Sequence, residues 1–227
     1  MFLPDLKIET GSRAVIFFTL PEWNYAKNRL FMNKKAGFLN LKIRYNEKAL
    51  ILGPLMGAPL VGIVIEVLNS LGIKEIIGVG WAGKVNPRLI KGDLFLPTKA
   101  YSLEGVSRFY FPKKRVFYPD RNIFKKVEKE IAKRISFKRG KILSVDAPLI
   151  FEKEKMHLHR WRNKVEAIDM ETSALFSVAH SLQMKVMALH FITDEVGIFS
   201  RERPEEEIKI KREKVFEVLE DFLDYKI

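Results

Sequence analysis

Short apolar runs of the kind that form buried strands alternate with helix-like segments along most of the chain. The strand-like runs are residues 14–18, 41–45, 49–52, 75–79, 94–96, 142–145, 165–168 and 186–192. The clearest helix-like segments are residues 60–71, 171–182 and 208–223. This alternation predicts an α/β fold with a largely parallel or mixed sheet. Because 227 residues, 47% of them hydrophobic, suit one well-buried core, we expect a single domain spanning residues 1–227.

The ends of the predicted strands are where a site is expected. In α/β sheets, ligands bind in crevices beyond the carboxyl ends of the strands. The segments that follow Leu52, Val79, Val145 and Ile192 are therefore the first places to look for functional residues.

Composition excludes several classes of protein. The chain has no Cys, which rules out a disulfide framework, a Cys-ligated metal centre and a thiol nucleophile. His157 and His159 lie two apart among charged residues, so we expect neither a metal site nor a resident cofactor. No apolar run reaches the ~18 residues of a membrane span, and the first residues lack the pattern of a signal peptide. We expect a soluble, cytoplasmic protein with no membrane partner.

The net charge of +12 is concentrated in one stretch. Residues 108–141 hold 13 basic and 3 acidic residues. Four apolar residues in that stretch recur at helical spacing: Phe124, Val127, Ile131 and Ile135. With Asp120 as an N-cap, they predict an amphipathic surface helix whose basic side chains are solvated. A surface that contacts RNA or another anion is the alternative, although many Lys, Glu and Ile residues without Cys also fit a heat-adapted proteome.

Two segments rich in small residues follow predicted strands. They are residues 53–59 (GPLMGAP) and 80–83 (GWAG). Neither has the spacing of a Walker loop or a dinucleotide-binding fingerprint. Each is compatible with a tight turn, or with backbone N–H groups that bind an anion or a sugar oxygen.

Carboxylates follow two other strand-like runs. Asp169 is a plausible helix N-cap, and the helix dipole favours Glu171 in the first turn. A carboxylate at a strand end can also accept hydrogen bonds from two neighbouring sugar hydroxyls. Asp194 follows residues 186–192, where burial would raise its pKa and suit it to hold a proton; a capped turn is the alternative.

Taken in order, these segments resemble the nucleoside phosphorylase and nucleosidase superfamily. The matching segments are residues 53–59, 80–83, 92–93, 104–110, 144–147, 169–172 and 193–194. The resemblance implies a three-layer α/β/α domain with a mixed central sheet that cleaves the N-glycosidic bond of a nucleoside. It also implies a homo-oligomer, either a dimer or an assembly of dimers.

The resemblance also implies roles for individual residues. Asp194 matches the acid that protonates or hydrogen-bonds the leaving base, Glu171 the ligand of the ribose hydroxyls, and Met170 the residue beneath the sugar. The segment at residues 80–83 matches a substrate-binding segment of the family, which makes Trp81, Ala82 and Gly83 candidate substrate-binding residues. Phe151 is the candidate for stacking on the base.

Departures from the family pattern leave the nucleophile open. Gly78 stands where phosphorylases of the family usually carry Arg, and Trp81 stands where they have Ser or Thr. Residues 18–24 do not match the Arg-bearing phosphate loop, whereas Glu22 is placed like the Glu with which nucleosidases activate water. Hydrolysis is therefore slightly favoured over phosphorolysis.

Two alternatives remain open. Inorganic phosphate could be a co-substrate if Lys34, Lys35 or Arg44 of a neighbouring subunit bound it. The second alternative is a nucleoside-binding module without activity, since the Trp81 side chain could fill the phosphate site.

Overall fold

The computed structural model describes residues 8–38, 41–153, 159–197 and 204–227. The strands are β1 (Arg13–Phe17), β2 (Lys34–Phe38), β3 (Leu41–Tyr45), β4 (Ala49–Gly53), β5 (Glu75–Lys84), β6 (Leu94–Ser102), β7 (Val116–Phe117), β8 (Lys138–Ser144), β9 (Ala167–Asp169) and β10 (Lys185–Glu195). The helices are α1 (Leu20–Arg29), α2 (Ala58–Ser70), α3 (Val106–Tyr110), α4 (Arg121–Ala132), α5 (Pro148–Lys153), α7 (Thr172–Ser181) and α8 (Glu205–Leu223).

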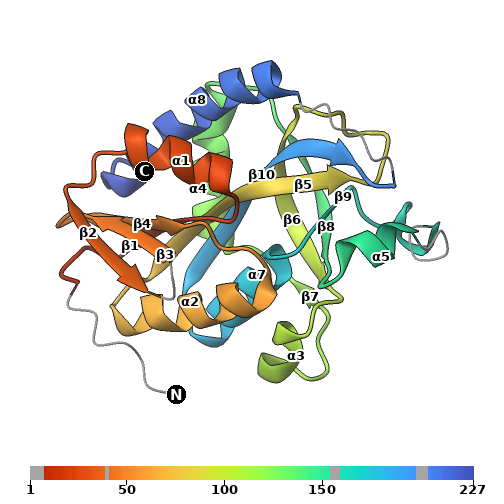
Figure 1. The fold of residues 1–227 in the computed structure, drawn as a ribbon, viewed down its shortest axis with the longest axis horizontal. Helices are drawn as coiled ribbons and strands as arrows, with labels where there is room; N and C mark the ends of the chain where they lie inside the picture. The colour runs from red at the N-terminus through yellow and green to blue at the C-terminus, as the bar shows by residue number, and fades with distance from the viewer. Residues whose placement is uncertain (1–7, 39–40, 154–158, 198–203) are drawn as a thin grey trace.

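The strands form one mixed sheet that closes on itself at one end. Its order is β10-β6-β8-β9-β5-β1-β4-β3-β2, and β10 also pairs with β5. Strands β5, β10, β6, β8 and β9 therefore form a ring, from which β1, β4, β3 and β2 extend (Figure 1). The predicted α/β fold with a mixed sheet flanked by helices is confirmed, whereas the ring was not foreseen.

Helices cover both faces of the sheet. Helices α2, α3 and α7 pack together on one face, while α1, α4 and α8 lie on the other (Figure 1). Each face has its own apolar cluster, with Leu50, Ile65 and Leu175 in the first and Ile51, Val127 and Phe216 in the second. This double cover explains why strands β1, β4 and β5 are apolar on both sides.

The helix predicted in the basic stretch is confirmed. Asp120 accepts hydrogen bonds from the backbone N–H groups of Asn122 and Ile123, at 2.9 and 3.0 Å, and α4 follows. The apolar face of α4 is buried, and most of its basic residues are exposed. No helix in the described part of the chain combines the length and apolar character needed to cross a bilayer.

The segment at residues 80–83 is strand rather than turn. Strand β5 continues to Lys84 because β10 pairs with it along this whole segment, and β9 pairs with Gly83 and Lys84. The glycines make room for a ring: a Cβ on Gly80 would lie 2.6 Å from Phe18 Cδ2, and one on Gly78 2.7 Å from Phe18 Cζ. Close packing, rather than a turn, accounts for these glycines.

Candidate functional site

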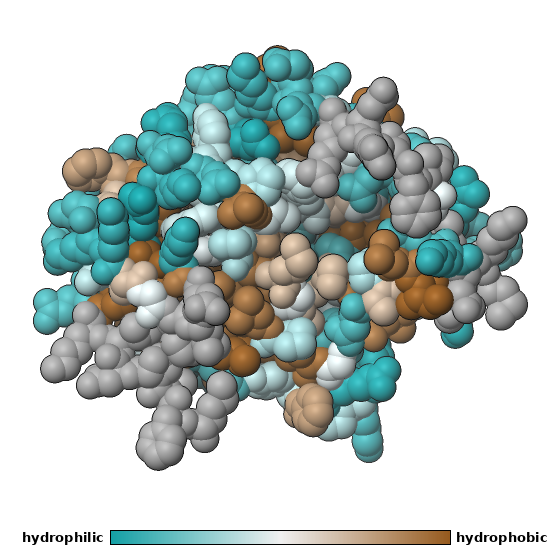
Figure 2. Space-filling view, viewed as in Figure 1, coloured by the Kyte–Doolittle hydropathy of each residue, from teal (hydrophilic) through white to brown (hydrophobic). Residues whose placement is uncertain are grey.

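A cavity of about 260 Å³ opens at the carboxyl ends of the strands, beside α5. Its lining residues are Phe18, Thr19, Met56, Trp81, Ala82, Gly83, Pro148, Leu149, Glu152, Ile168, Asp169, Met170, Glu171, Thr193 and Asp194. They follow or end β1, β4, β5, β8, β9 and β10, so the segments singled out after Leu52, Val79, Val145 and Ile192 all reach one cavity. Met56 and Leu149 are 71% and 63% exposed, so the cavity has an apolar rim. Figure 2 shows apolar side chains gathered in the middle of this face and beside α5.

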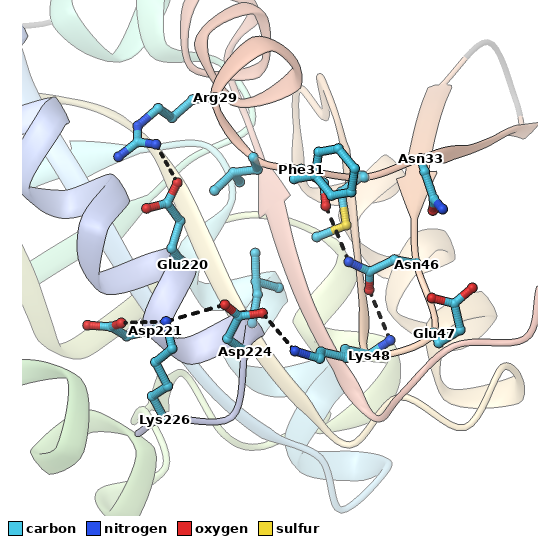
Figure 3. A pocket seen from close by; sticks show the side chains of 13 residues that line it. Arg29, Phe31, Asn33, Asn46, Glu47, Lys48, Glu220, Asp221, Asp224 and Lys226 are labelled. Carbon is cyan, nitrogen blue, oxygen red and sulfur yellow. Dashed lines mark hydrogen bonds and ion pairs between the residues drawn. The ribbon is translucent and has the colours of Figure 1, made fainter.

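A larger hollow of about 540 Å³ lies between the end of α8, the segment that joins α1 to β2 and the turn that joins β3 to β4 (Figure 3). Its charged groups pair with one another. Arg29 contacts Glu220 at 2.7 Å, and Asp224 lies 3.4 Å from both Lys48 and Lys226. These mutual ion pairs leave few charged groups there for a ligand, and we take the strand-end cavity as the candidate site.

Six of the eight predicted site residues line the strand-end cavity. They are Trp81, Ala82, Gly83, Met170, Glu171 and Asp194. Glu171 and Asp194 come from segments on opposite sides of α7 in the sequence, and the fold brings both to this cavity. The two others, Glu22 and Phe151, are not among its described lining residues.

The carboxylate of Glu171 is held by two backbone N–H groups. Gly57 donates to Oε1 at 2.7 Å, and Met170 donates to Oε2 at 3.2 Å. Of the two alternatives left open for residues 53–59, a tight turn or N–H groups that bind an anion or a sugar oxygen, the N–H of Gly57 fits the second in a modified form, because it binds a carboxylate of the protein itself. Each carboxylate oxygen keeps a second lone pair for a hydroxyl donor.

Burial sets the acidity of Glu171. Loss of solvent and the nearby Asp169 carboxylate raise the pKa of Glu171 to about 8, although the two backbone hydrogen bonds act in the opposite direction. Two hydroxyl groups that donated to this carboxylate would favour its ionised form. Ligand binding at Glu171 would therefore be coupled to release of a proton.

Asp194 lies in a different environment. It is exposed to the cavity, so the burial that was expected at this residue is absent. Its Oδ1 accepts a hydrogen bond from the Thr193 hydroxyl. A Cβ atom on Gly83 would lie 3.2 Å from its Oδ2. The small residue at position 83 thus leaves the Asp194 carboxylate accessible.

A buried polar layer lies beneath the cavity. Asp169 accepts hydrogen bonds from the Ser144 hydroxyl at 2.6 Å and from the Thr172 N–H at 2.8 Å, although it ends β9 and the N-cap position of α7 is Glu171 rather than Asp169 as predicted. The Thr172 hydroxyl also lies 2.8 Å from His190 Nε2. Burial lowers the pKa of His190, which favours a neutral ring. This layer fixes the start of α7 and, with it, the position of Glu171.

The structure corrects the prediction for Glu22. Its side chain is fully buried, and Arg212 of α8 donates to it twice, from Nε at 2.8 Å and from Nη2 at 2.7 Å. The indole Nε1 of Trp81 donates to the same carboxylate at 2.9 Å. Trp81 lines the cavity, and Glu22 is held at its indole nitrogen. With both oxygens engaged, Glu22 is a structural anchor for Trp81 rather than the base that activates water.

We expect Arg212→Met to lower the free energy of unfolding by about 3–5 kcal/mol, because it leaves the Glu22 charge buried and unpaired. Denaturant titration followed by tryptophan fluorescence measures this loss. Lys209→Met, a change at a mostly exposed position on the same helix, is the matched control. Equal stability of the two variants would show that the Glu22–Arg212 pair contributes nothing.

The prediction for Phe151 is also corrected. Phe151 is buried in an apolar cluster with Leu143, Val145 and Ile168, whereas Pro148 and Leu149 reach the cavity. Helix α5, which was not predicted, turns Pro148 and Leu149 toward the cavity and Phe151 toward this cluster. The same helix brings Glu152, which the sequence analysis missed, to the cavity.

The cavity is acidic although the chain is basic. Of its described lining residues four carry carboxyl groups, Glu152, Asp169, Glu171 and Asp194, and none is Lys or Arg. Among the described residues, no group of three or more His, Asp and Glu side chains could hold a metal ion; His157 lies outside them. The arrangement suits a neutral or cationic ligand rich in hydroxyl and N–H groups.

Comparison with known proteins agrees with this fold. The family model described as the phosphorylase superfamily matches residues 19–224. A DeoD-type purine nucleoside phosphorylase of Geobacillus kaustophilus is 26% identical over 170 residues, covering 72% of this chain and 70% of the relative.

Solved structures of similar fold include two with different named activities. Uridine phosphorylase from Vibrio fischeri superposes with a TM-score of 0.79 at 19% identity, covering 93% of this chain and 92% of that one. The 5′-methylthioadenosine/S-adenosyl homocysteine nucleosidase of Campylobacter jejuni gives 0.73 at 18% identity, covering 93% and 99%. The chain belongs to the phosphorylase superfamily, whose nucleoside phosphorylases and nucleosidases are enzymes.

Proposed function

We propose that this enzyme hydrolyses the N-glycosidic bond of a ribonucleoside, with Glu171 binding the ribose and Asp194 the base. The observation that carries the proposal is that these two carboxylates, from segments far apart in the sequence, line one cavity at the strand ends. Ala82, Gly83, Met170 and Trp81 provide the remaining wall around the sugar.

The proposed reaction consumes one nucleoside and one water molecule. As the bond between C1′ and the base nitrogen breaks, its electron pair goes to the base, which takes a proton from the Asp194 carboxyl. The oxygen of water bonds to C1′, and the proton that water loses returns the aspartate to its acid form. Positive charge develops on the sugar during this step, and the acidic cavity stabilises it electrostatically.

The charge of the cavity favours water over phosphate as the nucleophile. A phosphate dianion would meet four carboxyl-bearing side chains and no described Lys or Arg. Phosphorolysis is the second candidate, because the relative in Geobacillus kaustophilus is named a phosphorylase. It requires cations from elsewhere, such as Lys34, Lys35 or Arg44 of a neighbouring subunit, and the homo-oligomer that would supply them remains a prediction.

The test is a panel of purine and pyrimidine ribonucleosides assayed for free base, with and without inorganic phosphate. We expect base release that does not depend on phosphate, with free ribose as the second product. Release that requires phosphate, with ribose 1-phosphate as the product, would favour the second candidate. Absence of base release across the panel would contradict both and favour a binding module.

A further inference from the structure

Two carboxyl groups, one of them assigned to the base, line the same cavity. Asp194 is on β10 and Glu152 on α5, and both line the cavity. Glu152 is half-buried, and its one hydrogen bond in the described structure is a long one, 3.4 Å from the Gly197 N–H. Most of its hydrogen-bonding capacity is therefore available to a ligand.

No cation compensates this pair within the described part of the chain. Neither carboxylate has a described Lys, Arg or His side chain within ion-pair distance, whereas the neighbouring Glu195 contacts Lys84 at 2.9 Å. Burial and the charge of Asp194 raise the pKa of Glu152. Both side chains thus stay available to hydrogen-bond a ligand in a cavity that no described cation neutralises.

In the proposed function Asp194 donates to the base, and the Glu152 carboxylate adds an acceptor in the same cavity, so the two form a donor–acceptor pair. A 6-aminopurine matches it, because N7 accepts a hydrogen bond and the adjacent 6-amino group donates one. A 6-oxopurine presents two acceptors, N7 and O6, and would leave the ionised carboxylate facing an oxygen. Such a mismatch of polar groups in a partly buried site is strongly discriminating.

We propose that Glu152 is a specificity-determining residue that binds the base together with Asp194 and favours 6-aminopurine nucleosides over 6-oxopurine nucleosides. This inference rests on the proposed function. Asp194 passes its proton to N7 during bond cleavage, while Glu152 accepts the hydrogen bond of the amino group. The family resemblance did not point to Glu152, and the cavity alone identifies it.

The test compares kcat/KM for adenosine and inosine in the wild-type enzyme and in Glu152→Gln. We expect the wild type to prefer adenosine by at least about tenfold, the factor that one well-made polar contact provides. The Gln amide can turn either its oxygen or its nitrogen toward the base. The ratio of kcat/KM for adenosine to kcat/KM for inosine should therefore fall close to one in Glu152→Gln. Lys153→Gln, a change at the exposed neighbouring position, should keep the wild-type ratio.

The outcomes separate the two proposals. A wild-type enzyme that cleaves nucleosides but prefers inosine, or an unchanged ratio in Glu152→Gln, overturns the specificity proposal alone. A wild-type enzyme that cleaves pyrimidine ribonucleosides but neither adenosine nor inosine also overturns the specificity proposal alone. Absence of base release from every ribonucleoside of the panel overturns the proposed function and the specificity proposal with it. If Glu152→Gln does not fold, calorimetry on the wild type decides: adenine should bind at least about tenfold more tightly than hypoxanthine, and equal affinities would contradict the proposal.

Discussion

Replacing Glu171 by Gln should lower kcat/KM for the best nucleoside by about 10²–10³. The carboxylate is placed by the Gly57 and Met170 N–H groups to accept two ribose hydroxyls, and a hydrogen bond to a charged group contributes about 1.5–3 kcal/mol. A Gln side chain keeps one acceptor oxygen and directs its NH₂ group at a hydroxyl or at a backbone N–H. Steady-state kinetics with free-base detection measures the loss.

The matched control is Glu166→Gln, which removes a carboxylate that accepts the Lys141 N–H and does not line the cavity. We expect it to keep wild-type kinetics. A 2′,3′-dideoxynucleoside offers a second check, because it lacks both hydroxyls and should be cleaved equally slowly by the wild type and Glu171→Gln. Full activity of Glu171→Gln on a ribonucleoside would remove Glu171 from the site.

The same substitution should change how stability depends on pH. A carboxyl group that ionises near its ordinary 4.5 when unfolded and near 8 when folded binds its proton more tightly in the folded state. This group therefore contributes stability below its unfolded pKa that is lost as pH rises through its folded pKa. Denaturant titrations at pH 5 and pH 8 should show a smaller decrease in the free energy of unfolding for Glu171→Gln than for the wild type.

Replacing Asp194 by Asn should lower kcat by about 10²–10⁴ with a smaller effect on KM, because general-acid assistance to the leaving base is lost. An amide can still hydrogen-bond the base but cannot give it a proton. A riboside of a good leaving group such as p-nitrophenol needs no such proton. We therefore expect Asp194→Asn to retain much more of its activity on that substrate than on a nucleoside.

The neighbouring Glu195→Gln is the control for Asp194→Asn. Glu195 pairs with Lys84 and does not line the cavity, so its removal should leave both substrates unaffected. Equal losses by Asp194→Asn on the nucleoside and on the p-nitrophenyl riboside would indicate that Asp194 positions the sugar instead of acting as an acid.

The sequence predicted the parts of the fold that depend on local patterns. Asp120 and the apolar spacing after it located α4, and the apolar runs located β1, β4 and the start of β5. The ring was not predictable, because pairing of β10 with both β5 and β6 is a long-range property of sheet twist and closure. For the same reason Gly80 was taken for part of a turn, although it makes room for the Phe18 ring.

The sequence predicted those residues of the candidate site that lie at or directly after the ends of strands. Glu171 and Asp194 reach the cavity because β9 and β10 end beside it. The predictions for Glu22 and Phe151 were wrong because each residue lies on a helix whose orientation depends on distant residues. Glu22 binds Arg212 of α8, and Phe151 packs into an apolar cluster. Glu152 shares that short helix with Phe151, and it could have been found only once the face of α5 was known.

A crystal structure with a bound C-nucleoside, whose base and sugar are joined by an uncleavable carbon–carbon bond, would test the location of the active site most directly. We predict the ligand in the strand-end cavity, with its 2′- and 3′-hydroxyls on the Glu171 carboxylate and its base against Asp194. A ligand bound instead in the larger hollow at the end of α8, or bound in the cavity with its sugar away from Glu171, would contradict this location.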